Sequence, residues 1–201
     1  MKRAFALCWL VFALACGSEV PAERSDWAPR RFVQARRGLT VDHAFAEDAK
    51  EAFDHAWSGY ERHAWGHDEL RPLSGTGRDW YTVSLFMTPV DAYDTMVLLG
   101  LDEQAIRVKI LIFEELTFEH DVSVQVFEIT IRLLGGLISA YQLDGDPRWL
   151  ALAVDLADRL MPAFDSPTGM PYVNVNLVTG ATEGSQNNPA EIGTLSLEFG
   201  Q

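Results

Sequence analysis

The chain has 201 residues, of which 29 are Asp or Glu and 16 are Lys or Arg, and its formal net charge is −13. Hydrophobic residues make up 48 % of it, which is enough to build one domain around an apolar core. The negative charge makes nucleic acid and anionic membrane surfaces poor partners, because both repel an acidic surface.

The first residues have the pattern of an export signal. Lys2 and Arg3 precede an apolar run over residues 4–15, which is too short to span a bilayer as a helix of about 20 residues. The run ends at Cys16 in a sequence that resembles a bacterial lipoprotein signal, although Ala13 stands where that pattern prefers Leu. We expect an exported protein of the bacterial periplasm or outer surface, with a signal over residues 1–16 and a lipid anchor on Cys16. An ordinary cleaved signal and an uncleaved anchor remain alternatives.

Residues 17–40 are polar, contain two prolines and show no apolar periodicity, so we expect a tether there. Both cysteines, Cys8 and Cys16, lie in the signal. The domain predicted over residues 41–201 therefore has no cysteine for a disulfide, a metal site or nucleophilic chemistry.

The domain is predicted to be helical. Apolar residues in 44–65 recur at a spacing of 3.6, which indicates a helix with one buried face. Thr88, followed by proline, predicts a second helix start, and Gly100 predicts its end. Asp146, followed by proline, predicts another start. Alternation typical of a strand is confined to 172–178, so the predicted fold class is all-α.

Residues 126–141 form the most apolar stretch after the signal, yet Glu128 and Arg132 lie one helical turn apart within it. Helical spacing places polar and small residues along one side of this segment, a set that we call the polar stripe: Gln125, Glu128, Arg132, Gly135, Ser139 and Gln142. Such a stripe suits a helix that lines a ligand cavity. A buried structural salt bridge explains the Glu128–Arg132 pair equally well.

Other polar residues have structural explanations as well as functional ones. Asp91, Asp94 and Thr95 form a helical patch that can face a ligand, but acids near a helix N-terminus need no function. Glu191 stands three residues after Asn188, the spacing of a capping box, and the residues alone favour that role.

His67, Asp68 and Glu69 are adjacent in the sequence and so are not at metal-ligand spacing on a helix. A buried, hydrogen-bonded turn explains these residues better than a metal site.

Six segments resemble, in order, those of class I α-mannosidases, glycoside hydrolase family 47: AWGHDEL (64–70), VDAYDTMVLLGL (90–101), VFEITIRLLGGLISAYQLDGD (126–146), RLMPAF (159–164), MPYVNVNLVTG (170–180) and AEIGTLSLEF (190–199). The resemblance implies an inverting exo-hydrolase that removes α-1,2-linked mannose from high-mannose oligosaccharides or glycoproteins. It also implies an (α/α)7 barrel of paired helices with a calcium ion at its base.

The resemblance assigns three site residues. Glu128 matches the acid that assists departure of the leaving sugar, Arg132 matches the arginine that binds the glycan beside it, and Glu191 matches a carboxylate that contacts the terminal sugar. The base candidates and the calcium-binding region belong to the later half of the family's barrel. We therefore expect this chain to be an N-terminal portion of the barrel, without metal ligands and inactive alone.

Two other hypotheses remain from the sequence. One is a non-hydrolytic, lectin-like glycan-binding protein, similar to the degradation-enhancing relatives of these mannosidases. The other is a helical interaction module without a sugar site. In either case the membrane is reached only through the N-terminal signal or its lipid.

Overall fold

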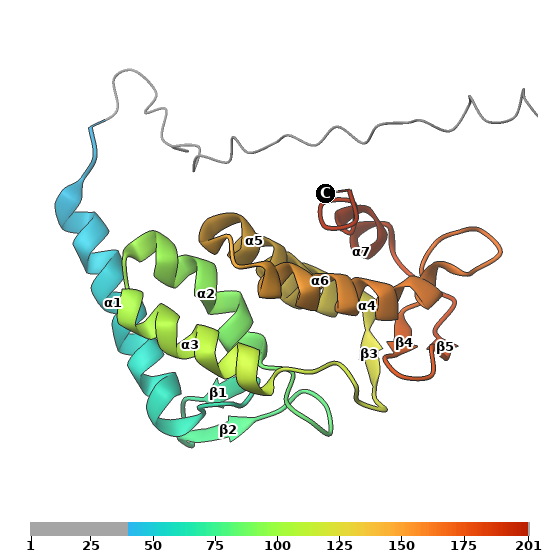
Figure 1. Ribbon diagram of the computed structural model, residues 1–201, viewed down its shortest axis with the longest axis horizontal. Coiled ribbons are helices and arrows are strands. Elements are labelled where there is room, and N and C mark those ends of the chain that lie inside the picture. The colour runs from blue at the N-terminus through green and yellow to red at the C-terminus, as the bar shows by residue number, and fades with distance from the viewer. Residues whose placement is uncertain (1–39, 201) are drawn as a thin grey trace, which may run out of the picture. The chain divides into compact units, whose positions relative to one another are not determined.

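The computed structural model describes residues 40–200 (Figure 1), so the predicted signal, Cys16 and nearly all of the tether lie outside the described residues. The helices are α1 His43–His63, α2 Met87–Leu99, α3 Asp102–Glu115, α4 Val126–Ile129, the π-helical turn η1 Thr130–Leu134, α5 Gly135–Asp144, α6 Pro147–Leu160, the 3₁₀ turn η2 Met161–Phe164 and α7 Pro189–Thr194. The strands are β1 Glu69–Arg71, β2 Thr76–Arg78, β3 Ser123–Gln125, β4 Asn174–Asn176 and β5 Thr182–Glu183. The domain is mostly helical, as predicted.

The predicted helix ends agree with the structure at several positions. Helix α1 occupies the predicted segment, and Asp42 caps it by accepting a hydrogen bond from the Phe45 backbone N–H. The buried face predicted for this helix was wrong for its first half, because Phe45 is 71 % exposed and only Trp57 and Tyr60 of α1 are buried. Asp146 caps α6 in the same way through the Arg148 N–H. Gly100 ends α2 with a φ of 68°, a left-handed conformation that glycine adopts without strain.

The predicted start of α2 at Thr88 was wrong. The helix begins at Met87 after Phe86, which has a left-handed φ of 56° and makes no side-chain cap. The Thr88 hydroxyl instead donates to the backbone carbonyl of Asp68, at 2.6 Å. A tertiary contact has therefore taken the side chain that the sequence pattern assigned to the cap.

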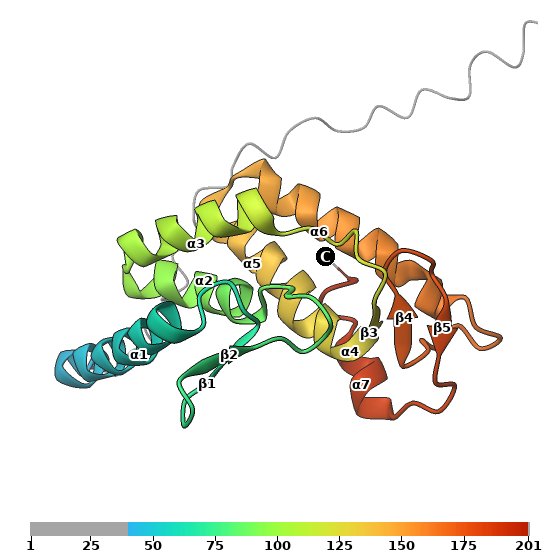
Figure 2. The same ribbon diagram turned by 90° about the horizontal axis from the view of Figure 1, so that it is seen from below.

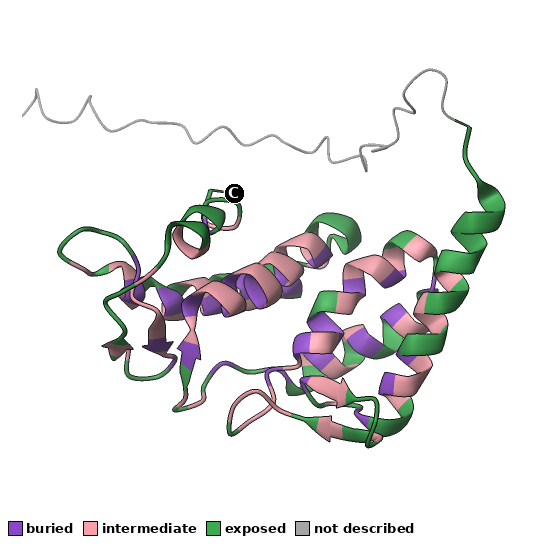
Figure 3. Ribbon diagram, turned by 180° about the vertical axis from the view of Figure 1, so that it is seen from behind, coloured by how far each residue is buried: buried purple, intermediate pink, exposed green. Residues whose placement is uncertain are grey.

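The helices pack as neighbours in two pairs. Helix α2 packs on α3, α5 packs on α6, and α2 also packs on α5, which joins the pairs (Figures 1 and 2). Buried positions gather where these helices meet, whereas the first turns of α1 are exposed (Figure 3). The paired helices hold α4, η1 and α5 at the centre of the core.

The described residues also form two small sheets, so the expectation of strands only in 172–178 was wrong. Strand β1 pairs antiparallel with β2 through a turn that contains Gly75, and β4 pairs with both β3 and β5. Strand β4 lies inside the predicted segment. Each strand has only two or three residues, too few to show the alternation from which strands are recognised.

The continuous helical segment Val126–Asp144 is long and apolar enough to cross a membrane by length and composition. Its apolar side chains are used inside the domain, where Ile129, Leu133 and Leu137 have no exposed surface. The segment therefore serves as the core helix of the domain and carries the polar stripe.

Candidate functional site

Glu128 and Arg132 form the predicted pair on the core helix. The Arg132 Nε donates to the Glu128 Oε2 at 2.8 Å, one turn away along α4 and η1. The side chains keep 25 % of the Glu128 surface and 38 % of the Arg132 surface exposed. Because both remain accessible, the pair is not the fully buried structural salt bridge that the apolar sequence also allowed.

Arg132 also contacts two residues from outside its own helix. Its Nη1 donates to the Asp91 Oδ2 on α2 at 3.2 Å, and its guanidinium lies over the Trp80 ring, 5.3 Å from the centroid. Burial disfavours the charge of Arg132, but the hydrogen bonds to Glu128 and Asp91 outweigh this effect and raise its pKa. Arg132 is therefore a fixed cation that joins α2 to the polar stripe.

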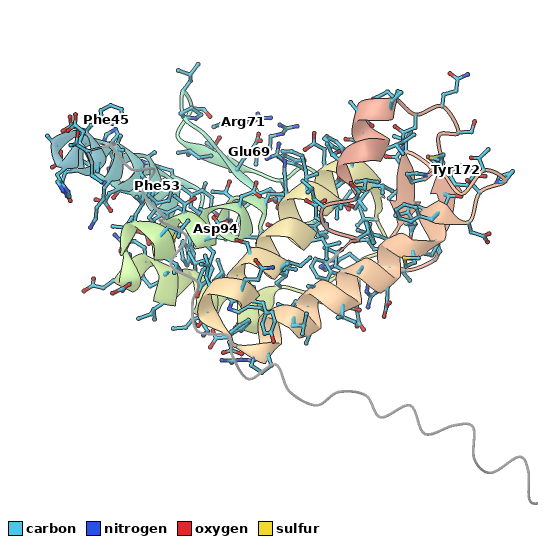
Figure 4. All side chains as sticks on the ribbon, turned by 90° about the horizontal axis from the view of Figure 1, so that it is seen from above. Phe45, Phe53, Glu69, Arg71, Asp94 and Tyr172 are labelled. Atoms are coloured by element: carbon cyan, nitrogen blue, oxygen red, sulfur yellow. The ribbon has the colours of Figure 1, made fainter. Side chains whose placement is uncertain are left out.

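The acidic patch on α2 faces this stripe, as the sequence allowed. Burial raises the pKa of Asp91 above its ordinary value, although the Arg132 guanidinium opposes the shift. One turn further along α2, the Asp94 Oδ2 accepts a hydrogen bond of 2.8 Å from the Ser139 hydroxyl on α5. Figure 4 labels Asp94 on the ribbon of α2. Two polar contacts thus tie α2 to the core helix along the same line.

The π-helical turn η1 lies within the stripe, between Glu128 and Gly135. Such turns occur often at functional sites, because the extra residue shifts which side chains face the same direction. Thr130, in this turn, has no exposed surface, and its hydroxyl has no hydrogen-bond partner among the described residues. The turn therefore interrupts the regular helical register at the position of the candidate site.

Glu191 is placed by α7, near the end of the chain. The Asn188 Oδ1 accepts a hydrogen bond from the Glu191 backbone N–H at 2.9 Å, which confirms Asn188 as the N-cap. The Asn188 N–H donates to the Asn187 side chain, and the described residues show no return bond from the Glu191 carboxylate. They also show no ion pair between Glu191 and Arg132. The structure thus forms half of the capping box and leaves the Glu191 carboxylate out of it.

Asp68 organises the loop that leads into α2. Its side chain accepts hydrogen bonds from the backbone N–H groups of Trp80, Leu85 and Met87, at 2.9, 2.7 and 3.1 Å. Asp68 is 1 % exposed. These bonds confirm the buried turn expected at this position, and they fix both Trp80 and the start of α2 next to the stripe.

Trp80 and Glu198 contact residues of the polar stripe, and the sequence revealed neither contact. Trp80 is held by Asp68 and by a hydrogen bond of 2.9 Å from its indole N–H to Glu69, on the hairpin seen in Figure 4. Glu198 lies against Gly135. The Glu198–Gly135 and Trp80–Arg132 contacts each join residues more than 50 positions apart, and the second also depends on a loop. No local spacing in the sequence therefore predicts them.

A calcium ion is implied by the resemblance, so we tested whether the described residues fit one. Among residues 40–200, no three His, Cys, Asp or Glu side chains are grouped to hold a metal ion. The Asp144 and Asp146 carboxylates are close, but the Lys109 ammonium binds both, at 2.6 and 3.1 Å. Asp91 and Glu128 are bound by Arg132. These four carboxylates thus have cations of the protein as partners, and neither pair fits calcium.

Comparison with known proteins shows which proteins this chain is similar to. The chain is 46 % identical over 153 residues to the endoplasmic reticulum mannosyl-oligosaccharide 1,2-alpha-mannosidase of Rattus norvegicus. This alignment covers 74 % of this chain and 23 % of the relative. It is 40 % identical over 190 residues to the human protein of the same name. This alignment covers 91 % of this chain and 27 % of that relative. The chain thus spans about a quarter of the length of these relatives.

The structure is similar to that of the alpha-1,2-mannosidase from Trichoderma reesei, with a TM-score of 0.73 and 29 % sequence identity. The match covers 81 % of this chain and 37 % of the other. The family model described as glycosyl hydrolase family 47 matches residues 52–201, a range that includes Glu128, Arg132 and Glu191. On this evidence the chain belongs to glycosyl hydrolase family 47.

Proposed function

We propose that this chain forms part of a mannosyl-oligosaccharide 1,2-alpha-mannosidase, an inverting hydrolase that removes α-1,2-linked mannose from high-mannose glycans. The names of its relatives, at 40 % and 46 % identity, support this activity and substrate. The observation that carries the proposal within this chain is the Arg132 guanidinium, which holds Glu128 and Asp91 together on an accessible polar stripe.

The proposed roles follow from the chemistry of these side chains. Hydrolysis of a glycoside needs a proton donor at the leaving oxygen, and Glu128 is the acid for this step, directly or through water. Arg132 orients the Glu128 carboxylate and offers its remaining N–H donors to sugar hydroxyls. Its cation–π contact with Trp80 helps to hold the guanidinium in place.

Glu191 is proposed to contact the terminal sugar. Its backbone N–H is used by the Asn188 cap, whereas the described residues give its carboxylate no hydrogen-bond partner. A carboxylate at a fixed helix start can accept hydrogen bonds from sugar hydroxyls.

The finer architecture is also a proposal. Packing of α2 with α3 and of α5 with α6 is compatible with consecutive helix pairs of an (α/α)7 barrel. Calcium belongs to the proposal only through the family, and no residue of this chain is assigned to it. Export and lipidation at Cys16 are proposed from the sequence of residues 1–16 alone.

Binding of a disaccharide tests the glycan site directly. The full chain is titrated with α-1,2-mannobiose and with α-1,6-mannobiose, and we expect the α-1,2-linked sugar to bind more tightly. Arg132→Leu is expected to raise its Kd by about tenfold or more, because hydrogen bonds to a charged group are lost. Arg62→Leu, on the exposed side of α1, is the matched control. Equal binding of the two sugars contradicts the assigned substrate.

A chimera tests catalysis. Residues 52–201 replace the matched segment of the rat relative, and release of mannose from α-1,2-mannobiose is measured. Glu128→Gln keeps the shape of the side chain but removes the acid, so we expect the rate to fall by about 10²–10⁴. An active chimera whose turnover is unchanged by this substitution contradicts the role of Glu128.

A further inference from the structure

The carboxylate of Glu198 lies against the polar stripe at Gly135. Its Oε1 is 3.4 Å, and its Cγ 3.6 Å, from the position that a Cβ on Gly135 would occupy. Gly135 is the first residue of α5 and directly follows the π-helical turn η1, which carries Arg132. A carboxylate from near the end of the described chain thus contacts the core helix at Gly135, a member of the polar stripe.

One oxygen of this carboxylate lacks a partner. The Glu198 Oε2 is shielded from solvent and has no hydrogen bond within the described part of the chain. Buried acceptors are nearly always paired, because an unpaired one loses its bonds to water without replacement. Other atoms of the residue remain partly exposed, as does Gly135, so a ligand that rests on the stripe can reach the Glu198 side chain, although not Oε2 in this conformation. Glu198 is therefore a partly exposed carboxylate beside Gly135 with one oxygen left unpaired.

The position of Glu198 is fixed by its neighbours. The Phe199 ring packs edge-to-face on Phe164, with 5.1 Å between centroids, and Leu195 is 4 % exposed in the core. Packing on both sides of Glu198 holds its backbone, so the approach of its side chain to Gly135 is set by the core. An acceptor held in place in this way is suited to recognition, because little conformational entropy is lost when a ligand binds.

We propose that Glu198 is a further glycan-binding residue, which accepts a hydrogen bond from a hydroxyl group of a mannose unit lying along the polar stripe. This inference rests on the proposed function and adds a residue to its site. The chemistry favours a neutral polyol, because Glu128, Asp91 and Glu198 together repel phosphate or carboxylate ligands. Gly135 is the position that leaves room for the Glu198 side chain and for the sugar above the helix.

The test compares binding of α-1,2-mannobiose to the full chain and to three variants. Glu198→Gln keeps the shape of the side chain but removes its charge and one acceptor oxygen, so we expect Kd to rise by about tenfold. Gly135→Ala adds a methyl group in van der Waals contact with the Glu198 Oε1, in the space proposed for the sugar, and is expected to raise Kd as well. Glu115→Gln, an exposed glutamate at the end of α3, is the matched control and should leave Kd unchanged.

The double variant separates a shared effect from two independent ones. If Gly135→Ala acts through its contact with Glu198, it should add little to the loss already caused by Glu198→Gln. Thermal unfolding of each variant shows whether folding has changed. A more stable Glu198→Gln variant with unchanged Kd overturns the inference, because the unpaired oxygen then matters only inside the fold.

Two outcomes distinguish this inference from the proposed function. If the parent chain binds α-1,2-mannobiose and Arg132→Leu weakens binding but Glu198→Gln does not, the inference about Glu198 is overturned and the proposed function stands. If the parent chain binds no mannobiose, both are overturned. Weaker binding by Arg132→Leu, Glu198→Gln and Gly135→Ala, with the Glu115→Gln control unaffected, supports both.

Discussion

Gly136 lies so close to Val90 that a Cβ on this glycine would be 2.8 Å from the Val90 Cγ1 and 3.2 Å from the Val90 carbonyl oxygen. The missing side chain therefore lets α5 approach α2 at the level of the candidate site. This approach brings Asp91 within hydrogen-bond distance of Arg132. The close packing at Gly136 and the Asp91–Arg132 hydrogen bond thus both depend on the contact between α2 and the core helix.

Gly136→Ala is expected to separate these helices. The added methyl group meets backbone that cannot move freely, and overpacking of this kind costs about 1–3 kcal/mol. Urea unfolding measures the loss. Gly193→Ala is the control, because Gly193 has open space where the new methyl group would lie. This substitution should leave the free energy of unfolding unchanged or raise it by up to about 1 kcal/mol. Equal stability of the two variants would show that α5 tolerates a side chain at this contact.

Asp68→Ala is expected to destabilise the domain strongly. The substitution leaves the backbone N–H groups of Leu85 and Met87 buried without an acceptor, and each loss costs about 1–3 kcal/mol. Asp68→Asn retains one acceptor oxygen and should have an intermediate effect. Urea unfolding ranks the variants, and near-ultraviolet circular dichroism reports on Trp80. Asp79→Ala is a useful comparison, since within residues 40–200 Asp79 accepts hydrogen bonds only from the Asp68 backbone N–H and the His67 ring. A smaller effect from Asp68→Ala than from Asp79→Ala contradicts the central role of Asp68.

The sequence predicted those parts of the fold that local physics determines. The helical period of 44–65, the Asp146 cap and the Gly100 end are properties of a few neighbouring residues, and all three are confirmed. The β1–β2 hairpin escaped prediction because its strands are too short to show alternation. The left-handed Phe86 escaped because Asp68, 18 positions earlier, holds the backbone on both sides of it.

The site divides in the same way. The Glu128–Arg132 pair is an i, i+4 contact and could be predicted from spacing. Asp91 was recognised as a polar helical position, but its partner could not be named because the contact depends on how closely α2 and α5 pack. Trp80 reaches Arg132 only through the loop that Asp68 organises. The roles of Glu128, Arg132 and Glu191 stay predictions, because the structure shows where these side chains lie and not what they bind.

The Lys109–Asp144 contact predicts a dependence of stability on pH. Burial opposes the charge of Asp144, but hydrogen bonds from Lys109 and Trp149 outweigh it, so the pKa of Asp144 is below its ordinary value. A lowered pKa in the folded state means that ionised Asp144 stabilises the fold above its unfolded pKa of about 3.9. This stabilisation is lost as the pH falls through the lower, folded value.

Asp144→Asn should therefore destabilise the domain at neutral pH and flatten its stability profile below about pH 4. Unfolding by urea at a series of pH values measures the slope. Asp158→Asn, a substitution of the same type on α6 where the described residues show no ion pair for Asp158, is the control. An acid-induced loss as steep in Asp144→Asn as in the parent chain would assign that loss to other carboxylates.

The lipoprotein hypothesis predicts covalent labelling at one cysteine. Expression of the full chain in a bacterial host with radioactive palmitate should label the protein, and Cys16→Ser should abolish the label. Cys8→Ser is the matched control, because Cys8 lies within the apolar run and should not be needed for lipidation. An unlabelled, soluble, secreted product would instead indicate an ordinary cleaved signal.

The capping and sugar-binding interpretations of the α7 start can be separated, because they use different atoms. Asn188→Ala removes the acceptor of the Glu191 backbone N–H, so it should cost about 1 kcal/mol of stability. Glu191→Gln leaves that backbone bond intact, so stability should change by less than about 0.5 kcal/mol. If the Glu191 carboxylate contacts sugar, this second variant should weaken binding of α-1,2-mannobiose by about tenfold. Urea unfolding and a binding titration on both variants give the answer. A Glu191→Gln variant that loses stability and keeps its Kd would show that the carboxylate stabilises the helix start and has no part in recognition.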